Sequence, residues 1–198
     1  MDLQLNGKCA LVTGASRGLG YATALGLARE GCRVVINSRE PNRLSYAAAS
    51  ITQQTGTVTL PVDGDVTDPN FPIDLVQRTV DLLGGLDLLV TNTAGPPAGK
   101  FTDFDDNAWQ KAIDLALLSH VRLIRAALPY LRLSTAASVL TIAGERLELS
   151  RVLRPTQAQI RLFQALAGLV FVAAILAHLD LNLGARLSGA ALLALSLW

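Results

Sequence analysis

The sequence has little charge and few cysteines for its 198 residues, and each shortage excludes a class of function. Lysine and arginine together number 17 against 16 acidic residues, so the formal net charge is +1. Nucleic acid is not expected as a partner, because binding to the phosphate backbone needs a marked positive surplus. The two cysteines, Cys9 and Cys32, have no companions at metal-ligand spacing. They are expected to be free buried thiols, and neither a metal centre nor a disulfide framework is predicted.

The beginning of the chain also lacks features that would place it outside the cell. Residues 1–8 contain no apolar core of a signal peptide, which predicts a cytoplasmic location for the first domain. No repeat of 20–50 residues is visible, and this excludes a solenoid. Hydrophobic residues nevertheless make up 51% of the chain, and their excess is concentrated toward the C-terminus.

Between residues 9 and 142, short apolar runs alternate with helical stretches. The expected strands are 9–12, 33–37, 57–62, 86–90 and 137–142, and the expected helices are 21–30, 42–55, 73–83 and 108–131. Parallel neighbouring strands need crossover connections, so this order predicts an α/β fold, a doubly wound parallel sheet with helices on both faces. The runs are continuously apolar, which is typical of strands buried on both faces. The predicted Rossmann-type sheet is truncated after its fifth strand and followed by an apolar helical tail.

A glycine-rich turn follows the first expected strand. Residues 13–20 have the pattern T-G-x-x-x-G-x-G, with glycines at 14, 18 and 20. Glycine permits a tight strand-to-helix turn and lets the backbone approach a pyrophosphate closely. The N-terminus of the following helix offers unpaired N–H groups and a positive dipole end to the phosphates.

These features resemble those of the short-chain dehydrogenase/reductases. The turn resembles the family's cofactor motif, residues 92–95 (Asn-Thr-Ala-Gly) nearly match its N-N-A-G motif, and Asp65-Val66 matches the Asp-Val that contacts adenine. The resemblance covers residues 1–142 and implies a nicotinamide dinucleotide as the cofactor. The cofactor-binding residues that it implies are Gly14, Ser16, Arg17, Gly18, Leu19, Gly20, Asp65, Val66, Asn92, Ala94 and Gly95.

The end of the second strand indicates which dinucleotide is bound. An acid there hydrogen-bonds the ribose 2′-hydroxyl of NAD, whereas a small or basic residue admits the 2′-phosphate of NADP. The sequence has Asn37-Ser38-Arg39 and no acid before Glu40. Ser38 and Arg39, with Arg17 in the glycine turn, therefore favour NADP(H) over NAD(H), since the planar guanidinium group suits a phosphate. The alternative is that both arginines are ordinary surface charges.

The residues that the family uses for chemistry have no counterparts in this sequence. The resemblance implies a Tyr as general acid/base, a Lys four residues later, a Ser after the fifth strand and an Asn on the preceding helix. Four residues after Tyr21, Tyr46 and Tyr130 lie Leu25, Ser50 and Ser134, and the last lysine is Lys111. The serine position corresponds to Ala143 or Gly144, and the asparagine position to Ala116. No catalytic or metal-binding residue is therefore assigned, and His120 is expected to be a packed or interface histidine.

The character of the chain changes after residue 142. The expected domains are a dinucleotide-binding domain over 1–144, a basic linker over 145–158 and an apolar segment over 159–198. Residues 162–179 form an 18-residue stretch without Asp, Glu, Lys or Arg, near the ~20 residues that span a membrane. Membrane contact through 162–198 would place the first domain on the cytoplasmic face. The alternatives are a helix packed on the sheet and a tail from a fusion or a shifted reading frame.

The sequence thus leaves two classes of function open. One is an NADP(H)-dependent oxidoreductase by descent, similar to the family's 3-oxoacyl-carrier-protein reductase-like members, which transfers hydride between the cofactor and a carbonyl or alcohol but is inactive in this chain. The other is a non-catalytic nucleotide-binding or interaction protein tethered to a membrane. The family's usual association through the long helix predicts homo-oligomer contacts at 108–131.

Overall fold

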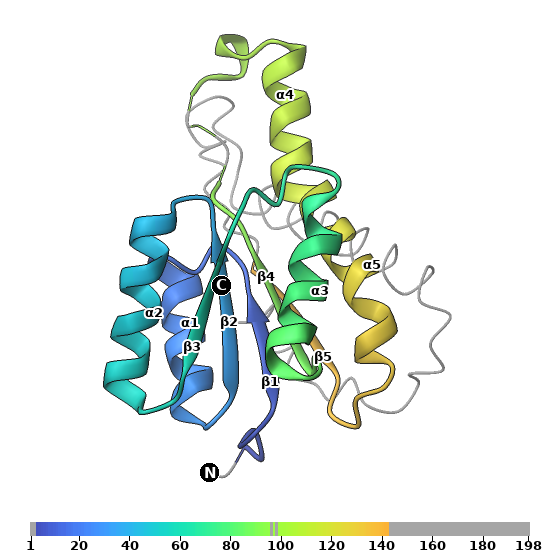
Figure 1. The fold of residues 1–198 in the computed structure, drawn as a ribbon. Coiled ribbons are helices and arrows are strands. Elements are labelled where there is room, and N and C mark those ends of the chain that lie inside the picture. Colours follow the sequence, from blue (N-terminus) through green and yellow to red (C-terminus); the bar gives the residue numbers. More distant parts are fainter. Residues whose placement is uncertain (1–2, 96, 98, 143–198) are drawn as a thin grey trace, which may run out of the picture. The chain divides into compact units, whose positions relative to one another are not determined.

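Five parallel strands form the only sheet in the part of the chain that the structure describes. The computed structural model describes residues 3–95, 97 and 99–142. The strands are β1 (Cys9–Val12), β2 (Arg33–Ser38), β3 (Thr59–Asp63), β4 (Leu88–Asn92) and β5 (Ser138–Ile142). Their order is β3-β2-β1-β4-β5 (Figure 1). The order reverses between β1 and β4, and the carboxyl ends of the strands at such a switch point form the crevice in which α/β sheets bind ligands.

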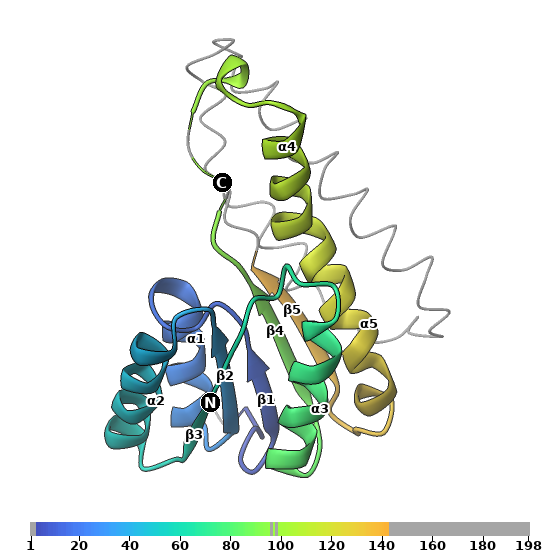
Figure 2. The same cartoon turned by 45° about the horizontal axis from the view of Figure 1, so that its top comes forward.

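Helices cover both faces of the sheet, which confirms the predicted doubly wound fold. Helices α1 (Gly18–Arg29) and α2 (Pro41–Thr55) lie on one face, and α3 (Phe71–Leu83) and α5 (Ser119–Leu131) lie on the other (Figures 1 and 2). Helix α4 (Asp106–Ile113) extends past the carboxyl ends of the strands, after a short 3₁₀ turn at Phe101–Asp103. The expected apolar helical tail lies outside the described residues.

Local sequence signals explain where the helices begin and end. The Glu40 side chain accepts hydrogen bonds from the amides of Asn42 and Arg43 at 3.3 and 2.9 Å, and Pro41 occupies the first helical turn of α2. An acceptor at this position satisfies amides that have no partner within the helix. After α1, Gly31 adopts the left-handed conformation with a φ of +83°, as expected of a glycine that ends a helix.

The core is built on the central strands. All residues of β1 and β4 are buried, and both cysteines are free and buried, as the sequence predicts. The prediction that every strand is buried on both faces is wrong for β5, where Val139 and Leu140 are 43% and 51% exposed. Among the described residues, β5 pairs only with β4 and is an edge strand.

Two further boundaries differ from those predicted. The long helix expected over 108–131 is interrupted by a π-helical turn at Asp114–Leu118, in which the Ser119 amide bonds to the Asp114 carbonyl. The fourth strand lies two residues later than predicted, because Thr91 and Asn92 are polar but buried in the strand. No helix of the described residues is long and apolar enough to cross a membrane, and residues 162–198 lie outside that range.

Asp87 joins three strands at the amino-terminal edge of the sheet. Its carboxylate accepts hydrogen bonds from the Cys9 amide at 2.8 Å and from the Ser134 hydroxyl at 2.5 Å. Its own amide and carbonyl bond to Cys9 and Ser138, both at 2.9 Å. Burial alone would raise the pKa of Asp87, but these hydrogen bonds and the charges of Lys8 and Arg33 outweigh it and hold the pKa below 3.8. The ionised carboxylate thus stabilises the fold.

Replacing Asp87 by Asn should lower the free energy of unfolding by about 1–3 kcal/mol at pH 7, since amides and hydroxyls lose a charged acceptor. Because the pKa is lowered in the folded state, the carboxylate stabilises the protein above about pH 4 and loses this effect as the pH falls further. The deficit of the variant should therefore shrink below pH 4. Urea unfolding at several pH values measures it, with Asp81→Asn on the exposed face of α3 as the control. An equal deficit in both variants would contradict the assignment.

Candidate functional site

The turn between β1 and α1 is fastened to the end of β4. Thr13 donates its amide proton to the Val90 carbonyl at 3.0 Å. Its hydroxyl donates to the Asn92 carbonyl at 2.8 Å and accepts from the Asn92 amide at 2.9 Å. Both residues are buried. These three bonds hold the glycine-rich turn at the switch point of the sheet. Thr13 was not among the residues predicted to bind the cofactor, although a Thr directly before the first glycine is the signal that could have identified it.

Gly14 and Gly20 lie where no larger residue fits. Gly14 has a φ of +59°, and a Cβ atom there would lie 2.6 Å from the Asn92 carbonyl oxygen. A Cβ atom on Gly20 would collide with the Gly14 carbonyl. The Asn92 side chain donates to that same carbonyl at 3.1 Å. The structure thus brings together three of the predicted site residues, and it shows that the Asn92 amide group supports the turn from within the protein.

The open side of the turn has room for a ligand. A Cβ atom on Gly18, whose φ is +61°, would meet nothing within 4 Å. Helix α1 begins at this glycine and has no acid in its first turn. Arg17 is the N-cap residue, and its side chain forms no capping hydrogen bond. Arg17 and Leu19 are exposed and Ser16 is partly buried. Uncapped amides and the positive end of the helix dipole at an open position are suited to an anion.

The end of β2 carries a second positive charge. The Arg39 guanidinium group lies 3.7 Å from the Asp65 carboxylate, and these side chains are 63% and 41% exposed. Glu40, the next residue in the chain, is engaged as the cap of α2. Asn37 is buried, and its side chain donates to the Val62 and Gly64 carbonyls, so it fixes the β2–β3 edge. Ser38 is partly buried beside Arg39, and its hydroxyl has no hydrogen-bond partner among the described residues.

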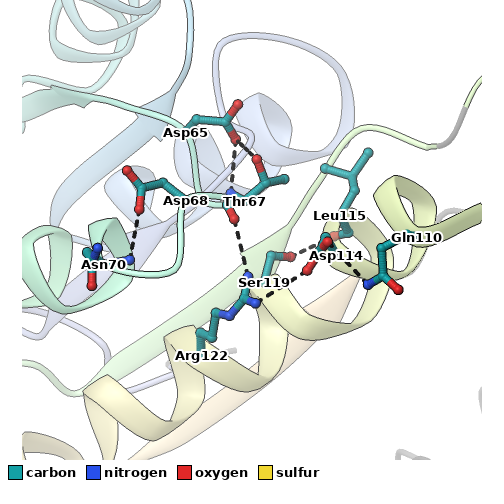
Figure 3. Close-up of polar contacts among 9 residues, drawn as sticks. All are labelled: Asp65, Thr67, Asp68, Asn70, Gln110, Asp114, Leu115, Ser119 and Arg122. Atoms are coloured by element: carbon teal, nitrogen blue, oxygen red, sulfur yellow. Dashed lines mark hydrogen bonds and ion pairs between the residues drawn. The ribbon is translucent and has the colours of Figure 1, made fainter. Parts of the chain in front are cut away.

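The loop after β3 presents the predicted adenine-contact pair. Asp65 accepts hydrogen bonds from the amide and the hydroxyl of Thr67 at 2.9 and 2.8 Å (Figure 3). Val66 is buried at 7% exposure. After β4, Ala94 and Gly95 are exposed. The predicted residues therefore line the carboxyl ends of β1, β2, β3 and β4. Arg17 precedes α1 and Arg39 follows β2.

His120 is packed beneath this site, as the sequence predicts. It is 1% exposed, and its Nε2 atom lies 3.5 Å from the Thr93 hydroxyl. Burial lowers the pKa of the imidazole below 6.5, so the ring is neutral at pH 7. Its Nδ1 atom has no partner among the described residues, and no carboxylate there orients the ring as a general base would need.

Two of the tyrosines, Tyr21 and Tyr130, are hydrogen-bonded to neighbouring helices. The Tyr21 hydroxyl bonds to Ser50 on α2 at 3.0 Å, and that of Tyr130 bonds to Gln77 on α3 at 2.6 Å. Tyr46 is 79% exposed on α2. The described residues also hold no cluster of three or more His, Cys, Asp or Glu side chains that could bind a metal ion. The arrangement can bind an anionic nucleotide, and no acid/base pair is apparent in this part of the chain.

Comparison with known proteins agrees with this geometry. The family model described as short chain dehydrogenase matches residues 8–147, and a model for a domain of unknown function matches residues 115–198. An uncharacterised oxidoreductase of Staphylococcus epidermidis is 31% identical over 137 residues, which cover 69% of this chain and 58% of the relative. A Staphylococcus saprophyticus oxidoreductase is 31% identical over 142 residues, with 72% and 61% covered. The chain thus spans about 60% of the length of these relatives.

Solved structures give the same result. L-sorbose reductase from Gluconobacter frateurii, complexed with NADPH and L-sorbose, matches with a TM-score of 0.68 and 33% identity over 71% of this chain and 54% of its own. A short chain dehydrogenase from Burkholderia cenocepacia in complex with NADP matches with a TM-score of 0.64 and 30% identity, over 69% and 55% of the two chains. By its sheet order, its glycine turn and these matches, the chain belongs to the short chain dehydrogenase family.

Proposed function

We propose that this chain binds NADP(H) at the carboxyl ends of β1, β2 and β4. The observation that carries the proposal is the cradle formed by Gly14, Gly20 and Asn92, which leaves the N-terminus of α1 open beside Gly18. The pyrophosphate would lie against the amides of residues 16–20. Bound NADP(H) supplies a hydride donor or acceptor.

The choice of NADP(H) over NAD(H) is supported by charge. Arg39 at the end of β2 is exposed, and its partner in the protein, Asp65, lies at a distance of 3.7 Å. A 2′-phosphate carries more negative charge than a carboxylate and can accept two hydrogen bonds from the guanidinium group. The complexes of the L-sorbose reductase and the Burkholderia cenocepacia dehydrogenase with NADPH and NADP also support this choice. Asp65 and Val66 would contact the adenine ring, and Ala94 and Gly95 would lie along the rest of the cofactor.

We further propose that these 198 residues bind the cofactor without turning over a substrate. The sequence contains no Tyr followed four residues later by Lys, and Ala116 occupies the position at which the family has an Asn. A phenol with a pKa near 10 needs a neighbouring cation to exchange protons at neutral pH. The proposed parts are the nucleotide-binding domain (1–144), the basic linker (145–158) and the apolar segment (159–198). The match of residues 115–198 to the model for a domain of unknown function supports the view that the tail is a sequence found in other chains.

The remaining expectations about partners stay proposals. Ile113 and Leu117 are 43% and 40% exposed on the long helix, which supports contacts between copies of the chain there. Membrane contact through residues 162–198 and a location on the cytoplasmic face of a membrane stay predictions from the sequence. If the tail is a membrane tether, the full chain should sediment with membranes after a carbonate wash. If it is not, the full chain should stay in the supernatant.

The cradle predicts that Gly14→Ala weakens NADPH binding at least tenfold, because the new methyl group meets the Asn92 carbonyl and must move the turn. Such a displacement removes well-aligned hydrogen bonds of about 1.5–3 kcal/mol to a charged group. Titration calorimetry with NADPH measures the loss, and circular dichroism checks the fold. Gly26→Ala is the matched control, since a methyl group there meets nothing within 4 Å. Equal binding by both variants would refute the placement of the phosphates.

The charge at the end of β2 predicts that Arg39→Gln lowers the preference for NADPH over NADH roughly tenfold, since about 1.4 kcal/mol corresponds to tenfold in affinity. NADPH binding should weaken while NADH binding stays nearly constant. Arg43→Gln is the control, because Arg43 is similarly exposed on α2 and pairs with Glu40. A ratio of the two dissociation constants that does not change in Arg39→Gln would contradict the role of Arg39.

The absence of the family's acid/base residues predicts that purified protein oxidises no NADPH with a panel of ketones, although it binds the cofactor. Absorbance at the NADPH band measures the rate. Oxidation that exceeds the background and disappears in Gly14→Ala would show that the chain is an active reductase.

A further inference from the structure

Arg122 connects two segments that lie far apart in the sequence. It projects from α5, where its Nη1 atom donates to the Thr67 carbonyl at 3.2 Å, 55 residues away in the chain. Its Nη2 atom lies 3.3 Å from the Asp114 carboxylate. The two side chains are only 24% and 30% exposed. Figure 3 shows the guanidinium group between the loop after β3 and the long helix.

The π-helical turn places Asp114 where Arg122 can reach it. In an uninterrupted α-helix, residues eight apart are rotated by about 80° from each other around the axis, whereas residues seven apart are rotated by only about 20°. The bond from the Ser119 amide to the Asp114 carbonyl spans five residues and so adds one residue to the turn. The eight-residue separation then behaves like seven, and both side chains lie on the same side of the helix. The Ser119 hydroxyl donates to the Leu115 carbonyl at 2.6 Å and so supports the widened turn.

Arg122 gives the loop after β3 a connection to helix α5 that the loop's internal hydrogen bonds do not provide. Asp65 accepts from Thr67, the Asp68 amide bonds to the Asp65 carbonyl at 3.1 Å, and the Asn70 amide bonds to the Asp68 side chain at 2.9 Å. These short-range bonds fix the shape of the loop, and Gly64 at its start bonds to Ser38 and Asn37 of β2. The bond to the Thr67 carbonyl ties the middle of the loop to a helix that is packed in the core.

We propose that Arg122 is a positioning residue that sets the adenine side of the nucleotide site, by holding the Asp65-Val66 pair through Thr67. The inference rests on the proposed function, since it assigns a role toward the same cofactor. Asp65 also faces Arg39 at 3.7 Å, so a shift of Thr67 is transmitted to the side chain that would meet the 2′-phosphate. Arginine is suited to this role because its planar fork serves two acceptors at once.

The test compares Arg122→Gln and Arg122→Lys with the wild-type chain. Binding of NADPH and of adenosine 2′,5′-bisphosphate, which has the adenine half alone, is measured by calorimetry. Arg122→Gln should lower the affinity for both ligands by the same factor, about fivefold, which is typical of residues that act at a distance. Arg122→Lys should recover only part of this loss, because an ammonium group cannot span Thr67 and Asp114. Hydrogen exchange should become faster at the amides of residues 67–70.

Arg125→Gln provides the matched control, because Arg125 is exposed on the same helix and carries the same charge. Asp114→Asn provides a second variant that leaves the bond to Thr67 in place, so a smaller effect is expected. The inference is overturned if Arg122→Gln matches Arg125→Gln in both binding affinity and hydrogen exchange of the loop. It is also overturned if the affinity for NADPH falls while the affinity for the bisphosphate does not. If the wild-type chain binds neither ligand, the proposed function fails, and loop exchange alone then decides whether Arg122 holds the loop.

Discussion

The contact between Thr13 and Asn92 is the constraint on which the site depends. A threonine hydroxyl that both donates to and accepts from one residue fixes the end of β1 against the end of β4. These bonds lie at the switch point of the sheet, because the chain continues from β1 to helix α1 on one face and from β4 to helix α5 on the other. The glycines are then required by steric contact, because the backbone of residue 92 occupies the space that a side chain at 14 would need. Sequence, packing and binding geometry are thus linked by two buried polar residues.

Much of this arrangement could be predicted, because it depends on short-range signals. The glycine spacing at 14, 18 and 20 and the glycine at 31 each act within a few residues of the turn or helix end that they determine. The structure has the glycine-rich turn between β1 and α1, where the sequence predicts it. The parallel, doubly wound sheet also follows from local evidence, since alternating strands and helices permit few topologies.

The features that were missed depend on contacts between distant residues. A single extra residue in the long helix hardly changes its apolar periodicity, so the π-helical turn at 114–118 left no clear signal. The partnership of Arg122 with Thr67 crosses 55 residues and has no pattern of its own. The end of β4 was placed too early because Thr91 and Asn92 are polar, and polar residues in a buried strand are accepted only when partners satisfy them. The exposure of β5 could not be read from Val139 and Leu140, since burial depends on the neighbours of a strand.

The pairing of β1 has a consequence for the order in which the chain can fold. β1 finds one neighbour, β2, about 24 residues downstream and the other, β4, about 78 residues downstream. Closing the second loop costs more chain entropy, and such long-range pairing slows folding. On the ribosome, the first three strands can assemble while the glycine turn still lacks its support. The candidate site is therefore complete only after residue 92 has emerged, and a nascent chain shorter than this exposes one edge of its central strand to aggregation.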